Sequence, residues 1–301
     1  MQQTDAISLE QSLAAEGVSQ YHASLWGDAF RRLFQNKLAV AGLVVALAIS
    51  VVAILAPMLQ PYPYAKIFYG YSEMPAGGRF LLGTDLSSRD NLSRMIYGAR
   101  VSMSVGLFTA LIIATFGVVV GAISGYYGGL VDTGIMRVVD IVYTIPSLLL
   151  AILLMSTLGK GLWQLCVSIG IVGWPTVARL VRGSFLSLRE KEFVKASRVA
   201  GTSDMKIILR HLLPNSLTPI IVAITFAIPT AIFTEAALSF AGIGINPPTP
   251  SWGQMVGQYE QYIQSDPWMS LPPAIMIGLA MLAFTFLGDG LRDALDPRMN
   301  K

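Results

Sequence analysis

Long apolar runs, separated by short polar segments, make up most of this sequence. Each run is close to the roughly 20 residues that an α-helix needs to cross a hydrocarbon core of about 30 Å. Backbone polar groups in lipid must be satisfied within the segment itself, which a helix achieves. We therefore predict an all-α integral membrane protein with six transmembrane helices. The predicted spans are residues 38–59, 101–125, 133–158, 162–180, 217–243 and 271–287.

Composition supports a membrane protein and excludes several kinds of site. The chain is 53% hydrophobic and 13% charged, whereas soluble domains carry roughly 25% charged residues. Its single cysteine, Cys166, excludes an internal disulfide framework and a cysteine-based metal cluster. The only two histidines, His22 and His211, leave no multi-histidine metal site. A net charge of +3 is too small to indicate nucleic acid as a partner.

The distribution of basic residues predicts the orientation. If the N-terminus lies in the cytoplasm, most of the 21 Lys and Arg residues fall on the cytoplasmic side, as the positive-inside rule requires. Residues 1–37 and 291–301 are then cytoplasmic tails. The start lacks the basic region and immediate apolar core of a signal peptide, so the first span should be retained. Residues 25–37 have apolar side chains at helical spacing, which indicates either an amphipathic helix on the membrane surface or the soluble start of the first span.

One polar stretch, residues 187–215, is unusually long for a connection between two spans. Its pattern predicts two short helices, because Gly201 can end the first in a left-handed turn. Thr202 and Ser203 are N-cap types for the second helix, and Asp204 suits its first turn. Cationic residues suit its last turn, and proline stops or kinks it. These last-turn residues are Arg210, His211 and Pro214. A compact helix-turn-helix on the cytoplasmic side would suit docking to another protein.

Charged and small residues inside the spans give further expectations. Asp140 and Glu235 are the acidic residues well inside spans, and intramembrane charge indicates function by default. Arg137 lies three residues before Asp140 and is expected to pair with it. Glu235 is expected either in a pathway or gate, or as the partner of a polar group on a neighbouring subunit. Pro146 is expected to kink the third span.

Glycines four residues apart are expected to share one face of the second span, where small residues allow close helix contact. They are Gly117, Gly121 and Gly125.

A nucleotide site is not expected in this chain. A phosphate-binding loop needs a glycine-rich segment that ends in Gly-Lys-Ser or Gly-Lys-Thr. The only Gly-Lys pair is Gly159–Lys160, and it is followed by Gly161. A set of nucleophile and base for hydrolysis is not recognisable either, so a membrane-bound enzyme has no supporting motif.

The stretch 187–215 resembles the cytoplasmic coupling loop of permeases of ATP-binding-cassette (ABC) importers. The family pattern is Glu-Ala-Ala, three residues, Gly, nine residues, Ile, one residue and Leu-Pro. Lys195, Ala196 and Ser197 occupy the first three positions, and His211 stands where Ile is usual. Positions that match at the right spacing are Gly201, Leu213 and Pro214.

Three other stretches resemble the C-type permease subunit of oligopeptide and dipeptide importers. One is FLLGTDLSSRDNLSRMIYGAR at residues 80–100, where Ser88 replaces a usual Gly. The others are PPTPSWG at 247–253 and GDGLRDALDPR at 288–298. The polar segments 60–100 and 244–270 are then extracytoplasmic, and residues 101–290 form the permease transmembrane domain.

The resemblance implies a type I ABC importer permease fold in the bacterial inner membrane, with coupling by the segment 187–215. It implies a second homologous permease, two cytoplasmic ATPase subunits that bind ATP and Mg²⁺, and an extracytoplasmic binding protein. The cargo would be oligopeptides or dipeptides; related permeases carry nickel, glutathione or oligosaccharides. An ion-coupled secondary transporter that uses Asp140 and Glu235 is the alternative of another class. Such proteins usually show internal repeats, and none is evident in this sequence.

Overall fold

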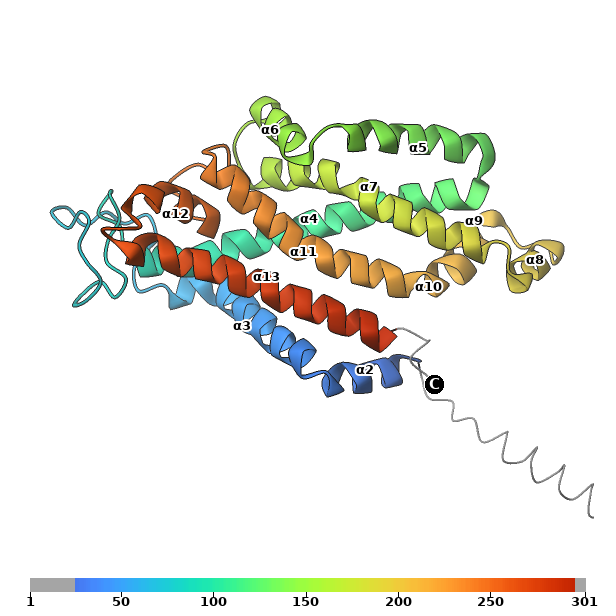
Figure 1. The fold of residues 1–301 in the computed structure, drawn as a ribbon, viewed down its shortest axis with the longest axis horizontal. Helices are drawn as coiled ribbons and strands as arrows, with labels where there is room; N and C mark the ends of the chain where they lie inside the picture. The colour runs from blue at the N-terminus through green and yellow to red at the C-terminus, as the bar shows by residue number, and fades with distance from the viewer. Residues whose placement is uncertain (1–24, 296–301) are drawn as a thin grey trace, which may run out of the picture.

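The computed structural model describes residues 25–295, and the predictions made for residues 1–24 and 296–301 lie outside that range. Regular structure within the described range is helical, apart from two isolated β-bridges in the segment 77–90. The long helices run side by side as one elongated bundle (Figure 1). The all-α prediction is confirmed for this part of the chain.

Five helices are long and apolar enough to cross a membrane, and a bent pair could supply a sixth crossing. The five are α3 (Lys37–Leu59), α4 (Asn91–Tyr127), α7 (Leu162–Leu188), α11 (Leu217–Phe240) and α13 (Pro267–Leu295). The pair consists of α5 (Gly129–Thr144) and α6 (Ser147–Leu158), which meet at a bend of 90°. The predicted third span is therefore broken into two helices.

Pro146 explains this break. Proline lacks the N–H that would continue the helical ladder, and it drives the preceding residue toward extended backbone. Ile145 adopts φ −85° and ψ 127° between the two helices. The predicted kink is confirmed at this position, but it is a sharp turn between two helices and not a bend within one.

Several helices extend beyond the predicted spans. Helix α4 begins at Asn91 because Asp90 caps it, with Oδ2 accepting from the Ser93 N–H at 2.8 Å. Helix α7 continues to Leu188, so residues 187 and 188 belong to the span and not to the loop helix. Helix α13 continues to Leu295, into the predicted C-terminal tail.

The glycine face of α4 packs against α7, as predicted. A Cβ added to Gly117 would lie 2.6 Å from Val177 Cβ, and one added to Gly125 would lie 2.6 Å from Phe185 Cβ. Real Cβ atoms do not approach so closely, so glycine allows the two backbones to come into contact here.

Helix α2 (Leu25–Gln35) is separate from the first span. Asn36 lies between the two helices and caps α3, because its Oδ1 accepts from the N–H of Leu38 at 3.1 Å. Ala29 and Leu33 are buried in a small cluster with Ala294 of α13, whereas Phe30 and Phe34 are exposed. The helix is amphipathic, and one of its edges rests on the end of α13.

The bundle has two distinct ends (Figure 1). At the α12 end lie residues 60–90 and the segment 241–266, which contains α12 (Trp252–Tyr259) and η2 (Glu260–Tyr262). At the α8 end lies the segment 189–216, with α8 (Glu192–Val199), α9 (Asp204–Ile207), the π-helical turn η1 (Ile208–Leu212) and α10 (Leu213–Asn215).

Candidate functional site: the helical segment between α7 and α11

The turn between α8 and α9 has the geometry expected at Gly201. Its φ is +72°, in the left-handed region that favours glycine. The Gly201 N–H donates to Arg198 O at 3.0 Å, and the Thr202 N–H donates to Ser197 O at 3.1 Å. These two bonds form a Schellman motif, which satisfies the last carbonyls of α8.

The second half of the segment differs from the simple helix predicted. Ser203 occupies the N-cap position of α9, but its side chain forms no capping hydrogen bond. The helix widens into a π-helical turn before Leu213 and Pro214, and it then passes into α11. The His211 ring lies 3.4 Å from Ser197 Oγ, so the two halves of the segment contact each other.

The underside of the segment is fixed to the bundle by apolar packing. Val194, Ile207 and Leu212 are fully buried in one cluster with residues of α4, α7 and α11. Among the bundle residues of this cluster are Tyr126, Val181, Phe185 and Ile220. The short helices α8 and α9 are thus held on the bundle, as short helices need tertiary packing to be stable.

The outer side of the segment is exposed and mixed in character. Val199 is 89% exposed, and Met205 and Leu209 are also exposed. Some of the charged side chains around them form weak local pairs, such as Lys195 Nζ to Glu190 Oε2 at 3.7 Å. Other exposed predicted residues are Ala196, Ser203, Asp204, Arg210 and Pro214; Thr202 and Leu213 are intermediate.

Tyr126, at the end of α4, contacts both halves of the segment, and sequence reasoning did not identify it. Its hydroxyl donates to Asp204 Oδ1 at 2.6 Å, and the Arg198 guanidinium lies 5.2 Å from the centre of its ring. Tyr126 itself is buried. The two partners lie 72 and 78 residues away in sequence, beyond the reach of local spacing rules.

A second polar cluster joins α4, α5 and α7 beside the segment. Arg182 of α7 forms a bidentate ion pair with Asp132 of α5, in which Nη2 lies 2.6 Å from Oδ2. Ser124 of α4 also donates to Asp132. Arg189 lies within 3.5 Å of the last carbonyls of α4. Since one carboxylate receives bonds from two other helices, it fixes how the three helix ends meet.

Glu235 is fully buried in α11, and its partners all come from this chain. Its carboxylate accepts from Ser251 at 2.6 Å, from Ser239 at 2.7 Å and from Ser102 at 3.2 Å. Ser102 lies on α4 and Ser251 caps α12. The carboxylate therefore joins α4, α11 and α12 at one point.

Asp140 does not pair with Arg137, and that prediction is wrong. Its Oδ1 lies 2.6 Å from Nη2 of Arg179 on α7. The side chains of this pair are 43% exposed for Arg179 and 52% for Asp140, and the guanidinium also lies 4.0 Å from the centre of the Tyr143 ring. Arg137 is exposed and has no ion pair or hydrogen bond within residues 25–295. Packing of α5 on α7 brings the more distant arginine closer.

The α12 end contains a buried charged cluster. Asp85 accepts from Arg89 Nε at 2.6 Å and lies 3.5 Å from Arg94 Nε. Arg94 is fully buried and also donates to Pro248 O at 3.2 Å and to Gln258 Oε1 at 3.4 Å. Burial raises the pKa of Tyr259, whose hydroxyl donates to Asp85. Residues 60–90 therefore form a folded cap and not a plain loop.

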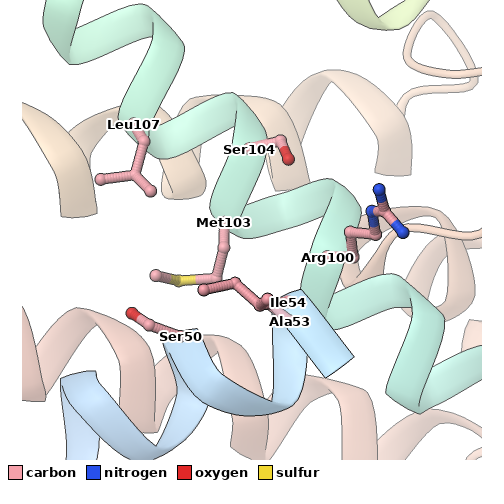
Figure 2. A pocket seen from close by; sticks show the side chains of 7 residues that line it. All are labelled: Ser50, Ala53, Ile54, Arg100, Met103, Ser104 and Leu107. Atoms are coloured by element: carbon pink, nitrogen blue, oxygen red, sulfur yellow. The ribbon is translucent and has the colours of Figure 1, made fainter. Parts of the chain in front are cut away.

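A small pocket of about 220 Å³ lies between α3 and α4. Met103 of α4 extends toward Ser50 of α3, and Arg100 points away from both (Figure 2). The lining is largely apolar, and the few polar groups do not converge on one point. Within the described residues no group of three or more His, Cys, Asp or Glu side chains could hold a metal ion.

Comparisons with known proteins agree with these features. Residues 117–301 match the family described as "Binding-protein-dependent transport system inner membrane component", and residues 24–76 match the "N-terminal TM domain of oligopeptide transport permease C". The chain is 44% identical to the dipeptide transport system permease protein DppC of Alkalihalophilus pseudofirmus, over 93% of this chain and 92% of that protein. It is 41% identical to the oligopeptide transport system permease protein OppC of Bacillus subtilis, over 95% and 94%.

The fold also resembles a solved structure. A chain from inward-facing conformations of the MetNI methionine ABC transporter superimposes with a TM-score of 0.57 at 20% identity, covering 67% of this chain and 96% of that one. At this identity the likeness supports the fold alone.

Proposed function

This chain belongs to the family of inner membrane components of binding-protein-dependent transport systems, and we propose that it imports dipeptides or oligopeptides as one permease of an ATP-driven complex. Its role is to form part of the transmembrane path and to couple that path to separate ATPase subunits. The two relatives, named as a dipeptide and an oligopeptide permease, support the peptide cargo.

The observation that carries the proposal is the construction of the segment 189–216. Its underside is anchored by buried Val194, Ile207 and Leu212, while Val199 and Met205 stand exposed on a polar surface. Apolar side chains that are exposed on the polar surface of a well-anchored segment are typical of a protein interface. We assign this surface to docking of the cytoplasmic ATPases.

The residues proposed for coupling are those predicted from the sequence. They are Lys195, Ala196, Ser197, Gly201, Thr202, Ser203, Asp204, Arg210, His211, Leu213 and Pro214.

With the α8 end in the cytoplasm, the tails lie on the same side and the α12 end faces outward. There the cap would meet the binding protein. Since the family is described as an inner membrane component, the proposed location is the bacterial inner membrane.

The face of α5 and α7 that carries Asp140 and Arg179 is proposed to border the path or the second permease. A half-exposed ion pair on membrane-spanning helices would be costly against lipid. Arg137 is exposed on the same helix as Asp140. Glu235 is proposed to brace the helices, since its carboxylate is fully buried and occupied by three hydroxyls of this chain.

The first test is affinity purification of the tagged chain in mild detergent, with identification of the proteins that accompany it. We expect a second permease and two ATPase subunits. Uptake assays in reconstituted vesicles with dipeptides, longer peptides, glutathione and nickel then define the cargo. Solute movement by the chain alone, without ATP, would contradict the proposal.

A matched pair of variants tests the docking surface itself. Val199→Lys removes an exposed apolar contact at the C-terminal end of α8, where a cation suits the helix dipole. Leu130→Lys changes a residue that is 90% exposed in the first turn of α5, outside the segment. Recovery of the ATPases should fall with the first variant and not with the second. Equal recovery would place the docking surface elsewhere.

A further inference from the structure

We propose that Tyr126 is the positioning residue through which movement of the segment 189–216 reaches helix α4, and through α4 the opposite end of the bundle. The inference rests on the proposed function and adds the internal route of coupling. The phenol, buried at the end of α4, contacts residues on both sides of the Gly201 turn.

The contacts of Tyr126 are polar and directional. The hydroxyl donates to the Asp204 carboxylate at 2.6 Å, which makes a charge-assisted hydrogen bond, stronger than a bond between neutral groups. The Arg198 guanidinium lies 5.2 Å from the ring centre, within the range of a cation–π contact. Arg198 lies in the last turn of α8 and Asp204 begins α9, so a rotation of either short helix moves a group that contacts the same side chain.

Apart from long contacts of Arg189, at the C-terminal end of α7, with the Gly125 and Tyr126 carbonyls at 3.4 and 3.5 Å, the remaining attachment of the segment to the bundle is largely apolar. Val194, Ile207 and Leu212 pack into a shared cluster that permits small sliding movements. A hydrogen bond constrains both distance and angle, whereas apolar packing is non-directional. The bond between Tyr126 and Asp204 is therefore the contact best suited to transmit a direction of movement.

Helix α4 extends from this contact to the α12 end. Its 37 residues span about 55 Å at 1.5 Å per residue. Near its other end, Ser102 donates to Glu235 and accepts from the Trp252 backbone N–H at 3.2 Å. The Trp252 indole also donates to Met95 O at 3.0 Å. One continuous helix thus connects the phenol at the α8 end with α12.

The C-terminal end of α4 also contacts its neighbouring helices. The Asp132 carboxylate accepts hydrogen bonds from Ser124 of α4 and from Arg182 of α7. The glycine face of α4 also packs directly against α7. A displacement at Tyr126 would consequently move α4 and α7 together and carry α5 with them.

Tyr126→Phe in the complete complex tests the inference, because it removes the hydroxyl and keeps the ring that faces Arg198. We expect peptide transported per ATP hydrolysed to fall about tenfold, as for the loss of a hydrogen bond to a charged acceptor. The amount of ATPase subunits that co-purify and the thermal stability should stay close to those of the unsubstituted complex. Tyr127→Phe is the matched control, since Tyr127 is 55% exposed and adjacent.

A double-mutant cycle with Asp204→Ala separates this route from a general structural effect. If the two groups act through their bond, the double variant should be no worse than the more impaired single variant. Additive losses, or a Tyr126→Phe complex coupled as well as the Tyr127→Phe complex, would overturn the inference. Failure of the unsubstituted chain to recover ATPases would instead contradict the proposed function, so the two failures are distinguishable.

Discussion

The two ends of the bundle are built in opposite ways. At the α12 end, Asp85, Arg89 and Arg94 are buried together, and Glu235 is enclosed by three hydroxyls. At the α8 end, the polar groups of the segment 189–216 are mostly exposed, and apolar Val199 faces away from the bundle. The charges at the α12 end pair with one another inside the fold, whereas most charged side chains of the segment 189–216 are exposed to outside contact.

This difference shows where a partner is needed and where it is not. Buried charges that are paired within the chain fix a single arrangement, because removing one partner leaves the other unsatisfied. Exposed apolar and charged side chains on short helices leave an arrangement that an outside contact can change. We expect substitutions at the α12 end to act on stability and those at the α8 end to act on coupling.

The largest effect on stability is expected for Arg94→Met. The substitution removes the buried donor to Pro248 O and Gln258 Oε1, and it leaves part of the charge of buried Asp85 without its partner. Loss of a buried ion-pair partner should cost about 3 kcal/mol. Thermal unfolding of the purified complex measures it. Arg100→Met, on the exposed side of the same helix, is the control; an equal effect of both would mean that the cluster does not hold the cap.

Gly201→Val is expected to act at the other end and on another quantity. Valine adopts the left-handed φ of +72° only at a cost of roughly 1–2 kcal/mol or more, so the turn between α8 and α9 should shift. A Cβ at this position meets open space, so no clash adds to the effect. Transport should fall at least tenfold while ATPase activity and unfolding temperature change little.

Gly201→Asn supplies the control for this experiment. Asparagine is similar in size to valine but tolerates left-handed backbone, so it should keep most of the transport activity. Full transport by the valine variant would contradict the coupling role, and equal loss in both variants would indicate that bulk and not backbone conformation matters.

Local patterns predicted much of this structure. The apolar runs, the turn at Gly201, the break at Pro146 and the glycine face of α4 each depend on residues a few positions apart. Spacing of that kind is set by the helix itself. It was therefore accessible from the sequence.

Contacts between distant segments were not predictable in the same way. Asp140 binds Arg179, 39 residues away, and not the arginine three residues before it. Tyr126 and Asp204 are 78 residues apart, and Glu235 lies 133 residues from Ser102. Which side chain fills such a site depends on how two helices rotate and slide against each other, and this follows from packing across the whole bundle.

Glu235→Gln should have a moderate effect. The amide keeps the shape of the carboxylate but replaces one acceptor by a donor, so one of the three serine contacts is weakened. A stability loss of about 1–2 kcal/mol is expected, with transport falling only as far as the amount of assembled complex falls. Measuring transport per assembled complex checks it. A selective loss of transport would move Glu235 into the path.

The smallest effect is expected for Ser88→Gly, and its sign is the informative part. Ser88 adopts φ +58°, in the left-handed region, at the position where glycine is usual in the pattern that it resembles. Glycine removes the steric cost of that backbone, while its greater freedom in the unfolded chain offsets part of the gain. The Ser88 backbone bonds to Asp85 O and to the Phe68 N–H are kept. We expect stabilisation of less than about 1 kcal/mol, seen as a slightly higher unfolding temperature. A clear loss of stability would show that the serine hydroxyl contributes to the cap, and that the α12 end depends on more than the buried charges of Asp85 and Arg94.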